Sequence, residues 1–217
     1  MATTVSGANG TDVILPEGVT TDDVQVTESE SGGTVVEVNK NTSDLEIFAQ
    51  SDAEISGKKL SDSTVSVEAE KGESTTVSIE TTFFKNGTIV NEGSGSLEVN
   101  LNTGKVKNLT IDAGNKKRND SITIADDVKL IKASMEMGKG NDTVRFGADT
   151  EFKGKSTLDL GKGGKDAVIL ESADGANGKL TITNVGRKDT ITVGDETFKG
   201  KDIANGASIP GVKVELA

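Results

Sequence analysis

The chain has 217 residues and a formal net charge of −11, from 24 Lys and Arg against 35 Asp and Glu. It contains no His, Cys, Trp or Tyr. These absences exclude Ser-His-Asp and Cys-His catalysis, thiolate or imidazole zinc sites and disulfide bonds, so that only oxygen ligands remain for a metal. The 26 Gly against 2 Pro are typical of a protein built from tight turns.

The charge is unevenly placed along the chain. Residues 1–112 hold 7 basic and 19 acidic residues, and residues 113–217 hold 17 and 16. We expect no nucleic-acid partner, since phosphates need clustered cations and single strands need aromatic platforms. No apolar run approaches the ~20 residues that span a bilayer, and the first residues lack a secretory signal. We therefore expect no membrane insertion, and either a surface protein exported by a type I-like route or a virion component assembled inside the cell.

Residues 1–62 read as short strands separated by Gly, Ser, Thr, Asn and Asp, the residues that make turns. The expected strands are 13–15, 24–26, 35–38, 45–48 and 53–55. Their centres fall ~11 residues apart, which is typical of an all-β domain and also equals half the period of the repeat described below.

Residues 63–112 carry two signals for β-hairpins. Residues 83–84 and 89–90 flank Asn86-Gly87, the strongest short hairpin signal, and residues 97–101 and 106–111 flank a turn at 102–104. We expect an antiparallel meander, either as half of a sandwich or as hairpins within a longer solenoid. Residues 1–112 are accordingly predicted to form an acidic, β-rich domain.

Residues 113–217 repeat. An Asp follows a Gly-rich or basic turn and precedes an alternating apolar strand in the segments 119–124, 141–146, 165–170 and 188–193. The spacings of 22, 24 and 23 residues between these Asp residues fall in the range of solenoids. A second apolar pair lies midway in each period: Leu109/Ile111, Met135/Met137, Leu158/Leu160 and Leu180/Ile182. We predict a parallel β-solenoid (β-helix or β-roll) of about four coils, two strands per coil, with residues 212–216 in the cap.

One turn carries a specific resemblance. Residues 138–144 read Gly-Lys-Gly-Asn-Asp-Thr-Val and resemble the nonapeptide Gly-Gly-x-Gly-x-Asp-x-apolar-x of the RTX (repeats-in-toxin) family. Met137 stands in place of the first glycine. The resemblance implies an exported protein in which turn carbonyls and Asp carboxylates hold Ca²⁺. The metal ligands it implies are Gly138, Gly140 and Asp142, with Asp166 and Asp189 in two degenerate copies and Asp120 at the matching position of the first repeat.

The same turns hold cations that suggest a different role. Stacked coils would place the four Asp residues roughly 5 Å apart, and such a column of like charges needs compensation. Calcium is one compensator. The other is the set of basic residues in the turns, namely Lys139, Lys162, Lys165, Arg187 and Lys188. We favour a structural ladder neutralised by these residues, in which the Asp side chains accept turn N–H groups.

These features favour a non-enzymatic function. We expect a structural or surface-display protein of a larger assembly, such as a cell-surface, secreted or virion decoration component, with protein partners or further copies of itself. The expectation includes no catalytic residue and no cofactor. A calcium-dependent RTX-like module is the alternative. A β-helix polysaccharide lyase or epimerase is the third, disfavoured by only three arginines and no Trp or Tyr to stack on sugar rings.

Overall fold

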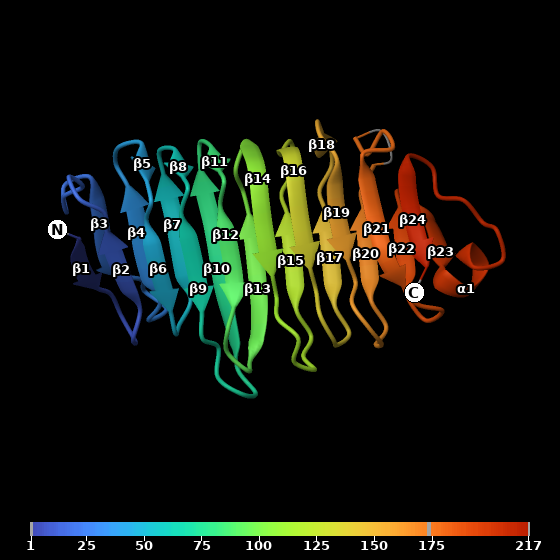
Figure 1. Cartoon of the computed structure of the whole chain (residues 1–217), viewed down its shortest axis with the longest axis horizontal. Coiled ribbons are helices and arrows are strands. Elements are labelled where there is room, and N and C mark those ends of the chain that lie inside the picture. Colours follow the sequence, from blue (N-terminus) through green and yellow to red (C-terminus); the bar gives the residue numbers. More distant parts are fainter. Residues whose placement is uncertain (1, 173–174, 217) are drawn as a thin grey trace.

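The computed structural model describes residues 2–172 and 175–216. It shows an elongated rod in which β-coils are stacked from one end to the other (Figure 1). The chain winds through about seven turns of a parallel β-solenoid. Its strands form two sheets, A and B, on opposite sides of one core. The predicted solenoid is confirmed and also includes the first half of the chain.

Sheet A holds the second apolar pair of each period. Leu109, Ile111, Met135 and Leu158 are all buried on its inner face. Its main path runs through β1 (Thr3–Ser6), β2 (Asp12–Leu15), β6 (Glu46–Ala49), β9 (Thr64–Val67), β12 (Thr88–Asn91), β14 (Lys105–Asp112), β16 (Lys129–Glu136), β19 (Ser156–Asp159), β21 (Leu180–Val185) and β24 (Val212–Leu216).

Sheet B holds the strands that follow the repeated Asp residues. Inward side chains such as Ile122, Val144 and Val168 occupy matching positions on neighbouring strands and are buried. Its order is β23 (Glu196–Lys199), β22 (Thr190–Val193), β20 (Ala167–Leu170), β17 (Thr143–Phe146), β15 (Ser121–Ile124), β13 (Ser96–Leu101), β10 (Ser74–Thr81), β7 (Ala53–Gly57), β4 (Thr34–Val38) and β3 (Val24–Glu28).

A bend divides sheet A, so that the prediction of two strands per coil is too simple. At this bend Asp44, Asp62, Asn86, Asn108 and Lys132 have φ between 50° and 61°, a left-handed conformation that Asn and Asp tolerate best. Side-chain amides join successive coils there, from Asn86 to Asp62 and from Asn108 to Asn86, both at 2.7 Å. Strands β14 and β16 run through the bend, and short strands precede it elsewhere: β5 (Thr42–Ser43), β8 (Leu60–Ser61), β11 (Phe84–Lys85) and β18 (Glu151–Phe152).

The predicted antiparallel meander in residues 63–112 is wrong. Strands β11 and β12 on either side of Asn86-Gly87 do not pair with each other but lie parallel to the strands of adjacent coils. Strands β13 and β14 likewise pair in parallel with neighbouring coils. Asn86 adopts the positive φ that the hairpin signal requires, but uses it to turn the corner of a coil. Both sheets therefore continue without a break across residues 112 and 113.

The two ends of the rod differ from its middle. Strands β1, β2 and β3 pair antiparallel at the N-terminal end and cover the first coil. At the other end β23 pairs antiparallel with β22, and a single helical turn, α1 (Gly200–Ile203), follows. The predicted cap strand is β24, the last strand of sheet A. Among the described residues no helix is long and apolar enough to cross a membrane.

Candidate functional site: the aspartate column and its turns

The four repeated Asp residues form one column. Asp120, Asp142, Asp166 and Asp189 each directly precede a strand of sheet B, and the register of those strands sets them side by side on successive coils. We call this set the aspartate column. All four side chains are buried, with residue exposures of 1–3%. The predicted stacking is confirmed.

Backbone amides hold the aspartate column in place. Each carboxylate accepts a hydrogen bond from the amide of the residue at the same position one coil earlier. The amide of Asp120 donates to Oδ1 of Asp142 at 2.8 Å, and the amide of Asp142 donates to Oδ1 of Asp166 at 2.9 Å. The Asp side chains therefore act as inter-coil ladder bonds at a corner where the backbone turns.

Burial makes three of these carboxyl groups unusually basic. Desolvation raises the pKa of Asp120 to about 6, that of Asp142 to about 7 and that of Asp166 to about 6. The charges of Asp120 and Asp166 raise the pKa of Asp142 further. These three groups therefore take up protons at a higher pH than exposed Asp residues do, which reduces the repulsion between neighbouring carboxylates.

Arg118 closes one end of the column, a role that its sequence position alone does not indicate. Its guanidinium donates to the carbonyls of Gly93, Gly95 and Ala113 at 2.7–2.9 Å, and its Nε lies 4.0 Å from Oδ2 of Asp120. The Arg118 residue is 7% exposed. It is the buried cation of the site, and its charge lowers the pKa of both Asp120 and Asp142.

The glycines of the RTX-like turn are required by close stacking. A methyl group added at Gly140 would lie 1.3 Å from the carbonyl oxygen of Arg118, and one at Gly138 would lie 1.8 Å from that of Gly114. Gly138 also has a φ of +86°, which disfavours other residues. These positions therefore let one turn lie directly on the turn of the coil before it.

The expected neutralisation of the column by the turn lysines is wrong. Lys139, Lys162, Lys165, Arg187 and Lys188 are exposed, and no ion pair among the described residues joins them to the column. The reason is geometric: the Asp side chains point under the turn toward the backbone amides, whereas the basic side chains leave it on the outside.

Two adjoining grooves run along these turns. Lys117, Lys139, Lys162, Lys165 and Lys188 line the first, of about 400 Å³, which we call the lysine groove. No acidic residue lines it.

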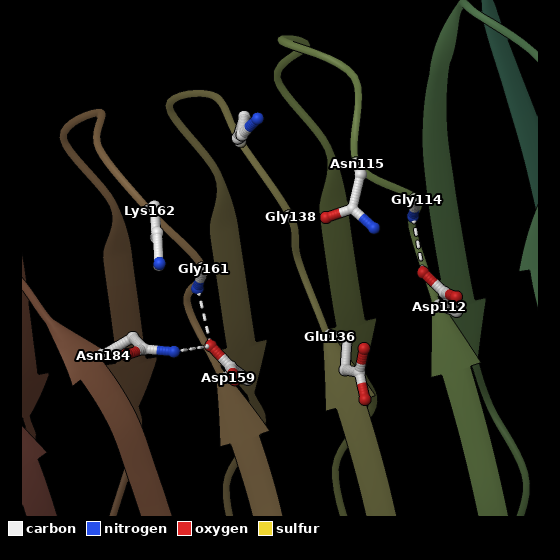
Figure 2. Close-up of a pocket in the computed structure, with 10 residues that line it drawn as sticks. Asp112, Gly114, Asn115, Glu136, Gly138, Asp159, Gly161, Lys162 and Asn184 are labelled. Carbon is white, nitrogen blue, oxygen red and sulfur yellow. Dashed lines mark hydrogen bonds between the residues drawn. The ribbon is translucent and has the colours of Figure 1, made fainter. Parts of the chain in front are cut away.

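The second groove, of about 360 Å³, shares Lys139 and Lys162 with the lysine groove. It also contains Asp112, Glu136 and Asp159, which stand at matching positions at the ends of β14, β16 and β19. We call these three residues the carboxylate row. Figure 2 shows them at the base of the glycine turns, with Asp159 accepting hydrogen bonds from the Gly161 amide and the Asn184 side chain.

The fit of the predicted calcium ligands is partial. Oδ1 of Asp142 already accepts a backbone amide, and the carbonyl of Gly138 accepts the amide of Lys162 at 3.1 Å. Oδ2 of Asp142 is buried without a hydrogen-bond partner, whereas Oδ2 of Asp120, which also lacks one, already faces the Nε of Arg118 at 4.0 Å. Among residues 2–172 and 175–216, no three acidic side chains are grouped so as to hold a metal.

Fold and site together define a class: a parallel β-solenoid whose coils are joined at one corner by buried Asp side chains. No family model matches the chain, and no curated protein or solved structure shows significant similarity to it. The repeat is compatible with a β-roll, and the RTX type rests on the residues of the turn at 138–144 alone.

Proposed function

We propose that this chain is a non-enzymatic structural module, a rigid rod that belongs to a larger assembly at a cell surface or on a virus particle. The observation that carries the proposal is the continuous stack. Two sheets extend along about seven turns over a single apolar core that reaches from Val13 to Ile209. In such a repeat each coil is stabilised by its neighbours, so that length and stiffness are its main physical properties.

The ends and the charge support this role. Antiparallel strands end both sheets at the N-terminal end of the rod and sheet B at its C-terminal end, and this break in the parallel repeat hinders edge-to-edge pairing between rods at those edges. Residues 1–112 carry 19 acidic against 7 basic residues. Repulsion between these halves keeps neighbouring copies apart in a crowded array.

Fractionation of the source cells or particles tests the proposal. We expect most of the protein to sediment with a surface or particle fraction. We also expect the purified chain to scatter X-rays as a rod and to release no product from a panel of polysaccharides. Recovery as a free protein together with catalytic turnover on any of these substrates would refute a structural role.

A calcium-dependent, RTX-like module is the second candidate, and one observation favours it. Oδ2 of Asp142 is buried without a partner, on the turn that carries Gly138 and Gly140. Hard cations prefer carboxylate and carbonyl oxygens. In this candidate the aspartate column and the turn carbonyls would hold Ca²⁺, which would supply positive charge and keep the column ionised.

Thermal melts followed by circular dichroism, in millimolar CaCl₂ and in EGTA, distinguish the two candidates. A calcium site filled at ~100 times its Kd adds about 2.7 kcal/mol to the free energy of unfolding. The structural candidate predicts that the two curves superimpose. The calcium candidate predicts a shift that MgCl₂ does not reproduce and that Asp142→Asn reduces.

A further inference from the structure

The lysine groove presents a regular row of exposed positive charges that takes no part in the packing of the coils. Its lysines come from four successive turns at the same corner of the solenoid, and all are exposed. Neighbouring coils lie ~4.8 Å apart, so that the row of cations is about 14 Å long. Among the described residues, no acidic side chain forms an ion pair with these lysines.

We propose that the lysine groove and the carboxylate row together bind an extended acidic polysaccharide, such as a chain of uronic acids. This inference does not depend on the structural role proposed above. A straight row of evenly spaced cations is complementary to a linear polymer with regularly spaced anions, and such an interaction gains from the release of bound counterions. The lysines would contact the carboxylates of the sugar units.

The carboxylate row decides the chemical class of the polymer. Glu136 and Asp159 lie beside Lys139 and Lys162 in the second groove, so that a ligand in contact with both grooves meets anions as well as cations. Sugar hydroxyl groups can donate hydrogen bonds to these carboxylates. These carboxylates repel every anion, and a polymer that carries hydroxyl groups beside each of its anions can offset that repulsion by donating hydrogen bonds to them, whereas the phosphates of a nucleic acid or of an anionic membrane carry no such donor.

The composition of the groove walls agrees with this choice. No aromatic residue lines either groove, so that single-stranded nucleic acid would find no stacking platform. Asn119 and Asn141 line the lysine groove and can both donate and accept hydrogen bonds. Recognition would thus depend on charge and hydrogen bonds rather than on sugar stacking.

Titration calorimetry with oligogalacturonate, at two salt concentrations, tests the proposal on the full chain. We compare wild type with a groove variant, K139Q/K162Q/K165Q, and with a control that loses the same charge outside both grooves, K155Q/K199Q/K201Q. Thermal melts establish that each variant is folded. We expect the groove variant to bind at least about tenfold more weakly and the control to bind within about twofold of wild type. Equal binding by both variants, or no binding by wild type, would overturn the proposal.

A second variant separates the classes of ligand. Glu136→Ala removes an acceptor for sugar hydroxyls and also removes a negative charge. The lost charge should favour every polyanion, whereas the lost acceptor should weaken only a ligand that donates hydroxyl groups, so we expect single-stranded DNA or phosphatidylserine vesicles to gain more affinity than oligogalacturonate. Tighter binding of wild type to DNA or vesicles than to oligogalacturonate at the same salt would overturn the assignment to a polysaccharide.

Discussion

The two halves of the rod share one backbone architecture and differ at one corner. At the register of the aspartate column, the earlier coils carry Thr75 and Leu97, and both are buried. The exposed charges on the same turns are mostly acidic in the first half, with Glu70, Glu73 and Glu92 against Lys71, and basic in the second. The polarity of the corner therefore reverses along the rod while both sheets continue unchanged.

Because the first half stacks without them, the Asp residues are not required for the stacking of coils. Parallel pairing and inward apolar residues are enough to build the first half. The second half adds buried carboxyl groups, which must be hydrogen-bonded and partly neutralised to be tolerated. Arg118 lies at the junction, where the uncharged Thr75 and Leu97 positions give way to the aspartate column. Variants at this junction and in each half should therefore differ in their effect on stability.

Loss of Arg118 should have the largest effect. Arg118→Met keeps the bulk of the side chain but leaves Asp120 without its buried cation and three backbone carbonyls without a donor. We expect the free energy of unfolding to fall by about 3–5 kcal/mol in urea titrations followed by circular dichroism. The matched control is Arg145→Met. Its exposed ion pair with Glu171 should contribute less than about 1 kcal/mol, and equal losses in the two variants would contradict the role of Arg118.

A methyl group at Gly140 should come next. Gly140→Ala forces the turn away from the Arg118 carbonyl and should cost about 3 kcal/mol. Gly104, at a turn on another corner, has open space around its added methyl group, and Gly104→Ala should change stability by less than about 0.5 kcal/mol. Urea titrations of both variants measure the difference. A tolerated Gly140→Ala would show that the coils need not stack this closely.

The acidic column should also give the protein an unusual pH dependence. In the folded state the pKa values of Asp120, Asp142 and Asp166 are about 6, 7 and 6, against an ordinary value of 3.8. Between these values the folded state holds more protons than the unfolded state, so that the stability conferred by protonation is lost as pH rises from about 4 to 7. In EGTA we expect the melting temperature to fall over that range. A rise would show instead that the folded state favours the ionised carboxylates, which would contradict neutralisation by protons.

Asp142→Asn tests the source of this trend. The amide oxygen can still accept the Asp120 amide, but the buried charge is gone. At pH 8 we expect a gain of about 1–2 kcal/mol, which shrinks as the pH is lowered toward 4. Asp52→Asn is the control, because Asp52 lies on an exposed turn of the first half and accepts the Thr76 amide there. This exposed substitution should change the free energy of unfolding by less than about 0.5 kcal/mol at pH 8.

The sequence predicts the solenoid of the second half well. It does not predict that the solenoid includes the first half, or how the buried Asp residues are neutralised. The period of about 23 residues and the inward apolar pairs identify the coils of the second half. In the first half the Asp that marks each period is replaced by Thr75 or Leu97, so that the repeat is hidden and Asn86-Gly87 imitates a hairpin. Whether lysine, calcium or a proton neutralises a buried Asp depends on where side chains point. The burial of Arg118 follows from that geometry, which periodicity does not encode.

The smallest effect concerns the bend of sheet A, where the two halves differ again. Asp62, Asn86 and Asn108 suit the left-handed conformation, but Lys132 occupies it in the next coil with a φ of 61°. Lys132→Asn should relieve strain and supply a side-chain amide that donates to Oδ1 of Asn108, as Asn108 donates to Asn86, for a gain of about 1 kcal/mol. A thermal melt should show this as roughly 2–4 °C. Lys107→Asn, on the neighbouring extended residue of β14, should give no gain, because Asn is disfavoured in a regular strand. Equal gains from both variants would mean that loss of a charge, not the backbone conformation, stabilises the rod.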